Sequence, residues 1–123
     1  MLRNQVTDPL YPECPIRNVI ARIGDKWSIL VLLTLDEKQK PQRYGEIQHA
    51  IPDISQKMLS QTLRELEADG LLLRTAYAEV PPRVEYSLTK RARTLMPHIH
   101  NLVEWAFTHL ADIVRDRSAY RRG

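Results

Sequence analysis

Apolar residues recur at intervals of three and four near the start of the chain, the spacing that places them on one face of a helix. Pro15 suits a first helical turn, and the helix that it opens is predicted to end at Ile23, before Gly24. Its apolar positions are Ile16, Val19, Ile20 and Ile23. Asp25 can cap a second helix, from Lys26 to about Leu35, which is apolar nearly all round. We therefore expect this second helix at the centre of the fold.

The middle of the chain predicts two short helices joined by a tight turn. The first covers residues 44–50 and ends before Pro52; its inward positions are Tyr44, Ile47 and Ile51. The second covers about residues 55–69, with Ser55 as its N-cap and Gly70 as a left-handed residue at its end. Its inward positions are Met58, Leu59, Thr62, Leu63 and Leu66. This arrangement is typical of a helix-turn-helix unit.

After Gly70 the hydrophobic period changes from about 3.6 residues to 2, the period of strands. Two alternating segments within about residues 71–88 flank a proline-bearing tip, residues 79–82, and predict a β-hairpin. Thr89 can cap a long last helix over about residues 89–114, which Pro97 should bend. Residues 115–123 are predicted as a basic tail, and residues 1–13 as an N-terminal arm.

A helix-turn-helix followed by a hairpin predicts a mainly α fold with a small β-hairpin wing, an α+β winged helix-turn-helix over residues 14–114. The length of 123 residues and the apolar share of 43% suit one domain with its own core. No run approaches the roughly 20 apolar residues of a membrane span. The start of the chain has no apolar run like the core of a signal peptide. We therefore expect a cytoplasmic protein without a membrane partner.

One face of the helix over about residues 55–69 carries residues that suit the major groove of DNA. They are Ser55, Gln56, Lys57, Ser60, Gln61 and Arg64. Glutamine can pair with adenine, whereas lysine and arginine can reach guanine or phosphate. Most of these residues lie in the N-terminal half, the end that a recognition helix points at the bases. An ordinary solvated helix face is the alternative interpretation, and the modest net charge of +3 does not decide between them.

Further DNA contacts are predicted around this helix. Arg43 and Tyr44 open the preceding helix, where phosphate contacts are usual, although Tyr44 equally suits the core. Arg83 in the wing can enter the minor groove or hold phosphate, or can pair with acidic neighbours, Glu79 or Glu85. Lys90, Arg91 and Arg93 stand in the first turn of the last helix, where cations are unfavourable. DNA phosphate would compensate for that cost, and a solvated face that tolerates it is the alternative.

The apolar stripe of the last helix is too wide to be buried against so small a domain. We therefore predict a two-fold homodimer in which part of this stripe and the first helix meet a second subunit. The predicted interface residues are Ile16, Val19, Ile20, Leu95, Ile99, Leu102, Val103, Ala106, Leu110 and Ile113, with Val114 continuing the stripe.

Cys14 is the single cysteine, so a disulfide within one chain is excluded. It stands at the start of the first helix, where a helix N-terminus lowers the pKa of a thiol. One interpretation is a sensor of oxidants or electrophiles; the other is an inert cysteine. The four histidines lack a convincing metal-ligand spacing, and no nucleophile motif or phosphate-binding loop is present. We expect no metal, no cofactor and no enzymatic activity; a small-molecule or redox effector remains compatible with the sequence.

Three segments together resemble the HxlR-type transcription regulators, a MarR-like winged-helix family. The first comprises Cys14-Pro15, Ile23 to Trp27 and Arg43 to Ile47 and resembles the family's opening. The second comprises Ile54 to Leu59 and Leu63 to Leu71 and resembles its recognition helix. The third is Pro81 to Thr89 and resembles its wing. The resemblance implies a dimeric regulator of transcription that binds double-stranded DNA through the residue 55–69 helix and Arg83. It also implies that Cys14 stands where some members sense quinones, aldehydes or oxidants. This chain departs from the family in reading Lys90-Arg91-Ala92 after the wing. A winged-helix module that docks on proteins instead of DNA is the competing function.

Overall fold

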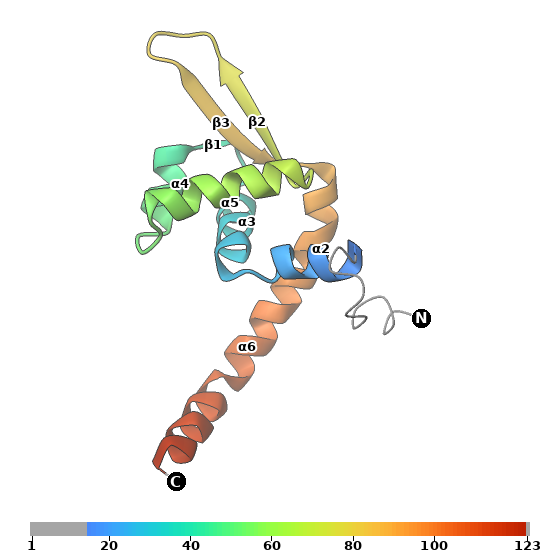
Figure 1. Ribbon diagram of the computed structural model, residues 1–123, viewed down its shortest axis with the longest axis vertical. Coiled ribbons are helices and arrows are strands. Elements are labelled where there is room, and N and C mark those ends of the chain that lie inside the picture. Colours follow the sequence, from blue (N-terminus) through green and yellow to red (C-terminus); the bar gives the residue numbers. More distant parts are fainter. Residues whose placement is uncertain (1–14, 123) are drawn as a thin grey trace.

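The computed structural model describes residues 15–122, with side chains from residue 19 onward. Its elements are α2 (Pro15–Ile23), α3 (Lys26–Lys38), β1 (Gln42–Arg43), α4 (Tyr44–Ala50), α5 (Gln56–Ala68), β2 (Leu72–Tyr77), β3 (Arg83–Leu88) and α6 (Lys90–Arg122). The β2–β3 hairpin projects from one end of the molecule, and α6 extends from the other (Figure 1). The predicted winged helix-turn-helix, mainly α with a small β wing, is confirmed.

The core forms around α3, as its apolar composition predicted. Val31 and Leu32 are completely buried, and they belong to one cluster with Ile47 of α4 and Leu59 and Leu63 of α5. α6 closes this cluster with Ala92, Met96 and Ile99. Since the apolar face of α5 is buried in this cluster, its opposite face points outward.

Capping residues set the ends of the helices. The Asp25 carboxylate accepts hydrogen bonds from the backbone N–H groups of Trp27 and Ser28, and Ser55 Oγ accepts one from Met58 N–H. Gly70 follows α5 with a φ of +74°, and a Cβ at that position would collide with the Arg91 guanidinium. α3 continues three residues past the predicted end at Leu35, to Lys38, and ends at Gln39 in the left-handed conformation, φ 57°.

The wing is part of a three-stranded antiparallel sheet of order β1-β3-β2. β2 and β3 pair from Leu72 opposite Leu88 to Tyr77 opposite Arg83. β1, which the sequence did not predict, places Gln42 opposite Tyr86. This short strand ties the base of the wing to the N-terminus of α4, so the wing and the helix-turn-helix unit share one framework.

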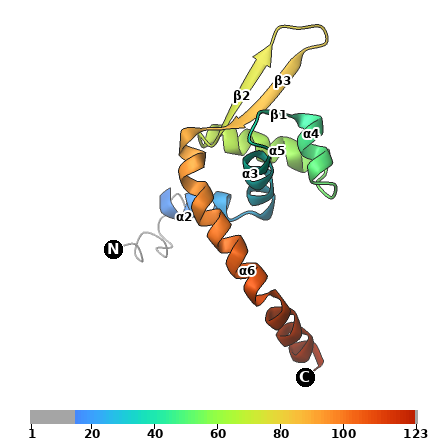
Figure 2. The ribbon, with the colours of Figure 1, turned by 180° about the vertical axis from the view of Figure 1, so that it is seen from behind.

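α6 is longer than predicted, because residues 115–122 continue the helix instead of forming a tail. It is helical on both sides of Pro97. His100 Nε2 lies 2.6 Å from Asp36 Oδ2 and fastens α6 to the end of α3. Beyond this contact α6 leaves the body of the molecule, as the view from behind also shows (Figure 2). No helix within residues 15–122 combines the length and the apolar character that a membrane crossing requires.

Candidate nucleic-acid interface

The outer face of α5 carries the residues that the sequence predicted for base contacts. Ser55, Gln56, Lys57, Gln61 and Arg64 are exposed, and Ser60 is half-buried. On the opposite face Leu59, Thr62, Leu63 and Leu66 are buried. Lys57 and Arg64 make no ion pair with any residue of the described chain, so their charges are available to a ligand. Gln61 is partly engaged, because its Nε2 lies 3.3 Å from Glu65 Oε1.

α4 meets the N-terminal half of α5 through Tyr44. The Tyr44 hydroxyl donates a hydrogen bond to the Gln56 carbonyl oxygen at 3.0 Å and lies 3.3 Å from Ser60 Oγ. This half-buried tyrosine therefore holds the two helices of the unit together, as the core interpretation of its role suggested. Arg43 is exposed beside it at the N-terminus of α4, and its backbone N–H donates to Glu46 Oε1 at 2.9 Å.

The wing arginine has acidic partners within the wing. Arg83 Nε lies 3.3 Å from Glu79 Oε2, without the geometry of a hydrogen bond, and Arg83 Nη1 lies 3.9 Å from Glu85 Oε2. Its guanidinium carbon stands 4.0 Å from the ring centre of Tyr77. Of the two alternatives for Arg83, DNA contact and pairing with acidic neighbours, the structure has the pairing. This pairing reduces the positive charge that Arg83 offers to DNA.

The rest of the wing offers one exposed cation that the sequence analysis passed over. Arg74 is exposed on β2 and has no ion-pair partner among residues 15–122. The alternation of the strand gives no sign of this cation, because Arg74 is on the same face as the buried Leu72, whereas Leu73 is exposed. At the tip, Val80 is fully exposed next to Pro81 and Pro82. The wing therefore presents a cation on one strand and an apolar tip.

A group of polar contacts surrounds the C-terminal end of α5, and we call it the Asp69 cluster. Arg91 Nη1 donates to the Asp69 carbonyl oxygen at 2.8 Å, Thr89 Oγ1 donates to the Gly70 carbonyl oxygen at 2.6 Å, and Arg22 Nη1 contacts Asp69 Oδ1 at 2.7 Å. A cation near a helix C-terminus is favourable by about 0.3–1 kcal/mol. Lys90, Arg91 and Arg93 are all exposed, and of the three only Arg91 has a side-chain hydrogen bond within the described residues. The cluster links α5 to both α2 and α6.

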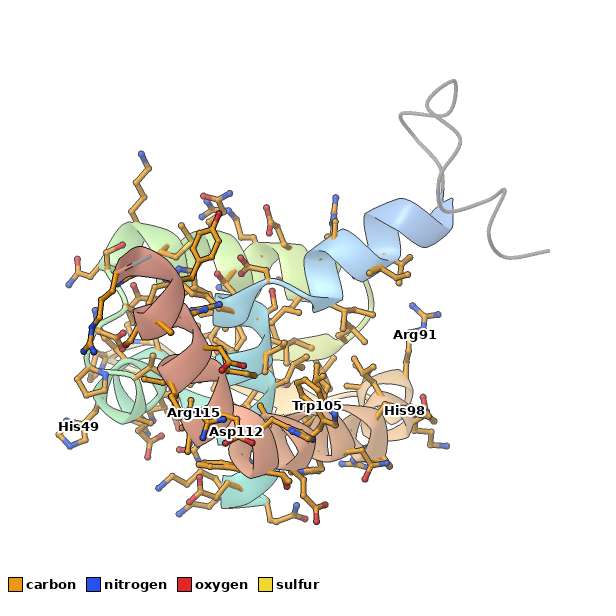
Figure 3. All side chains as sticks on the ribbon, turned by 90° about the horizontal axis from the view of Figure 1, so that it is seen from below. His49, Arg91, His98, Trp105, Asp112 and Arg115 are labelled. Carbon is orange, nitrogen blue, oxygen red and sulfur yellow. The ribbon has the colours of Figure 1, made fainter. Side chains whose placement is uncertain are left out.

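The projecting half of α6 carries an uncovered apolar surface, which we call the α6 stripe. Its exposed members are Leu102, Trp105, Ala106, Phe107, Leu110 and Val114. Figure 3 places Trp105, Asp112 and Arg115 along this part of α6. Ile99 instead belongs to the chain's own core, and Leu95 and Val103 pack against that core. Trp105 and Phe107 were not among the predicted interface residues, although they lie beside those positions on the helix.

The remaining predicted residues have mixed placements. Val19 and Ile20 are exposed on α2, at 53% and 55%, and Ile113 is half-buried. Cys14 and the side chain of Ile16 lie outside the part that the structure describes. Within the described part, histidine, cysteine, aspartate and glutamate do not gather in groups of three or more that could hold a metal ion.

Comparisons with known proteins agree with this geometry. The sequence profile of a family described as HxlR-like helix-turn-helix matches residues 22–113. A protein of Methanothermobacter thermautotrophicus, named only as an HTH-type transcriptional regulator, is 48% identical over 92 residues, which are 75% of this chain and 69% of that protein.

Solved structures of regulators superpose on most of the chain. The transcriptional regulator ytfH of Salmonella typhimurium gives a TM-score of 0.78 at 32% identity, over 90% of this chain and 97% of its own. The redox regulator HypR, in its oxidized form, gives a TM-score of 0.69 at 40% identity, over 77% of this chain and 96% of its own.

Proposed function

Because the chain belongs to the HxlR-like helix-turn-helix family of transcription regulators, we propose that it binds a specific operator as a homodimer and acts on the chromosome in the cytoplasm. The resemblance drawn from the sequence is confirmed by the family match. The regulators among its relatives and structural neighbours favour DNA binding over a module that docks only on proteins.

The exposed face of α5 carries this proposal. Gln56 and Lys57 stand at its start and Arg64 two turns later, all exposed and all of types that read base edges or hold phosphate. α5 is 13 residues long and buries the opposite face, so it can enter a major groove without losing its core contacts. Arg43 and Arg74 stand on flanking elements, where phosphate contacts would set the position of α5 on the duplex.

The α6 stripe supports the homodimer. A run of exposed Leu, Val, Trp and Phe side chains on one helix is typical of a surface that another protein covers. A second copy carries the same stripe, so a two-fold contact would cover both at once. Such a dimer would hold its two α5 helices about 34 Å apart, one turn of DNA, and would recognise a pseudo-palindrome.

Enrichment of genomic fragments by the purified protein tests the proposal. We expect fragments that share a pseudo-palindrome with half-sites about 10 base pairs apart, bound at physiological salt in an excess of random duplex. A parallel enrichment with the double variant Lys57→Ala, Arg64→Ala should lose these fragments, since the loss removes two of the cations on α5. Recovery of no common sequence by the wild type would contradict specific DNA binding.

We also propose that Cys14 gives the regulator a redox or electrophile response. Cys14 directly precedes α2, and Arg22 at the other end of α2 contacts Asp69 at the end of α5. A modification at residue 14 that shifts α2 would thus reach the recognition helix through the Asp69 cluster. The similarity to HypR, a protein named as a redox regulator, supports this role.

Diamide treatment should weaken operator binding by the wild type and leave Cys14→Ser unaffected. Two Cys14 thiols, one from each subunit, would form a disulfide, and diamide would take up the two hydrogens. Gel shifts with and without diamide measure the effect, and a reductant should restore binding. If the wild type and Cys14→Ser respond equally to diamide, Cys14 has no sensor role.

A further inference from the structure

The hydroxyl groups of Tyr44 and Ser60 meet under the outer face of α5. Tyr44 Oη lies 3.0 Å from the Gln56 carbonyl oxygen and 3.3 Å from Ser60 Oγ. Ser60 is half-buried and stands one turn after Gln56, among the exposed residues of the proposed reading face. Tyr44 itself comes from α4, so this contact joins both helices of the unit beside that face.

The number of hydrogens decides which group donates. A phenol has one O–H hydrogen, and a backbone carbonyl can only accept. The contact between Tyr44 and the Gln56 carbonyl therefore uses the Tyr44 hydrogen. The contact between the two hydroxyl groups can then form only if Ser60 donates its own hydrogen to Tyr44 Oη.

We propose that Ser60 faces DNA as a hydrogen-bond acceptor only and that it selects a base bearing an amino group, adenine or cytosine. In the major groove, adenine presents its N6 amino group and cytosine its N4 amino group as donors. Guanine presents O6 and N7 and thymine presents O4, all acceptors that repel the lone pairs of Ser60. This inference rests on the proposed function, because it assigns the specificity of one residue on the reading face.

Tyr44 is in this account a positioning residue. It acts through Ser60 by holding the serine hydrogen away from the groove. A phosphate oxygen is also an acceptor, so the same arrangement excludes Ser60 as a phosphate anchor. Ser60 thus differs from Lys57 and Arg64, whose groups only donate hydrogen bonds.

Selection from randomised duplexes with the wild type, Ser60→Ala, Tyr44→Phe and Tyr120→Phe tests the assignment. The position that Ser60→Ala relaxes should be adenine or cytosine in the wild-type site, preferred by about fivefold or more. Tyr44→Phe frees the Ser60 hydrogen, so guanine or thymine should become acceptable at that same position. Tyr120→Phe, an exposed tyrosine at the far end of α6, should select like the wild type.

A duplex that lacks only the amino group gives a second test that needs no change in Tyr44. Purine in place of adenine, or 2-pyrimidinone in place of cytosine, should weaken wild-type binding about fivefold and leave Ser60→Ala binding unchanged. The inference is wrong if Ser60→Ala relaxes a guanine or thymine, relaxes no position, or is as sensitive as the wild type to the missing amino group. It is also wrong if folded Tyr44→Phe keeps the wild-type preference. If the wild type selects no sequence at all, the proposed function itself fails.

Discussion

Leu110→Asp should convert the protein into a monomer with greatly weakened operator binding. Leu110 is 53% exposed on the α6 stripe, and a two-fold contact would bring both copies of the new carboxylate into an apolar interface. Burial of an unpaired charge costs several kcal/mol, which exceeds what one leucine contributes to a contact. A monomer holds only one half-site, so its affinity should fall by about two to four orders of magnitude.

Light scattering gives the mass of this variant, and gel shifts give its affinity. Thr108→Asp is the matched control, because it adds the same charge two residues away, about 200° around the helix. This control should remain dimeric and bind DNA normally. Leu102→Asp, elsewhere on the stripe, should behave like Leu110→Asp. Dimeric Leu110→Asp with full operator affinity would show that the stripe is not the subunit interface.

Gln56→Ala should lose about 1–3 kcal/mol of binding free energy at the operator and relax the preference at one base pair of each half-site. The reason is its exposed position in the first turn of α5, where an amide can bind an adenine edge in bidentate fashion. Binding to random duplex should change little, since random DNA rarely offers that base. Equal affinities of the wild type and Gln56→Ala on both duplexes would remove this residue from recognition.

Lys57→Ala should affect DNA binding differently from Gln56→Ala. If Lys57 holds a phosphate, its loss weakens operator and random duplex alike and lowers the slope of log affinity against log salt by about 1. Arg117→Ala is the control, because it removes a positive charge from the far end of α6. That variant should keep the wild-type slope. A purely operator-specific loss in Lys57→Ala would assign the lysine to a base instead.

The helix α5 could be predicted because its signals are local. Ser55 and Gly70 mark the ends of α5, and the inward positions repeat at helical spacing between them. The hairpin follows for the same reason, since strand alternation and a proline tip are both visible in the sequence.

Features that depend on distant partners could not be predicted. β1 is only two residues long and exists through its pairing with β3, so it leaves no periodic pattern. The extra turn of α3 ends at Gln39 in the left-handed conformation. A glycine at this position would have predicted the end of the helix, whereas a glutamine does not. The hydrogen bond from Arg91 to the Asp69 carbonyl could not be predicted, because the two residues lie far apart in the sequence. The acidic neighbours of Arg83 were visible in the sequence, but only the fold shows that Arg83 pairs with Glu79.

The molar mass of the complex between the purified protein and one enriched operator duplex tests the central claim most directly. Light scattering should give the mass of the duplex plus two chains of 14.3 kDa each, with no complex of intermediate mass populated at half saturation. A single chain bound to the operator at full affinity would contradict the account, because one α5 helix would then suffice for recognition.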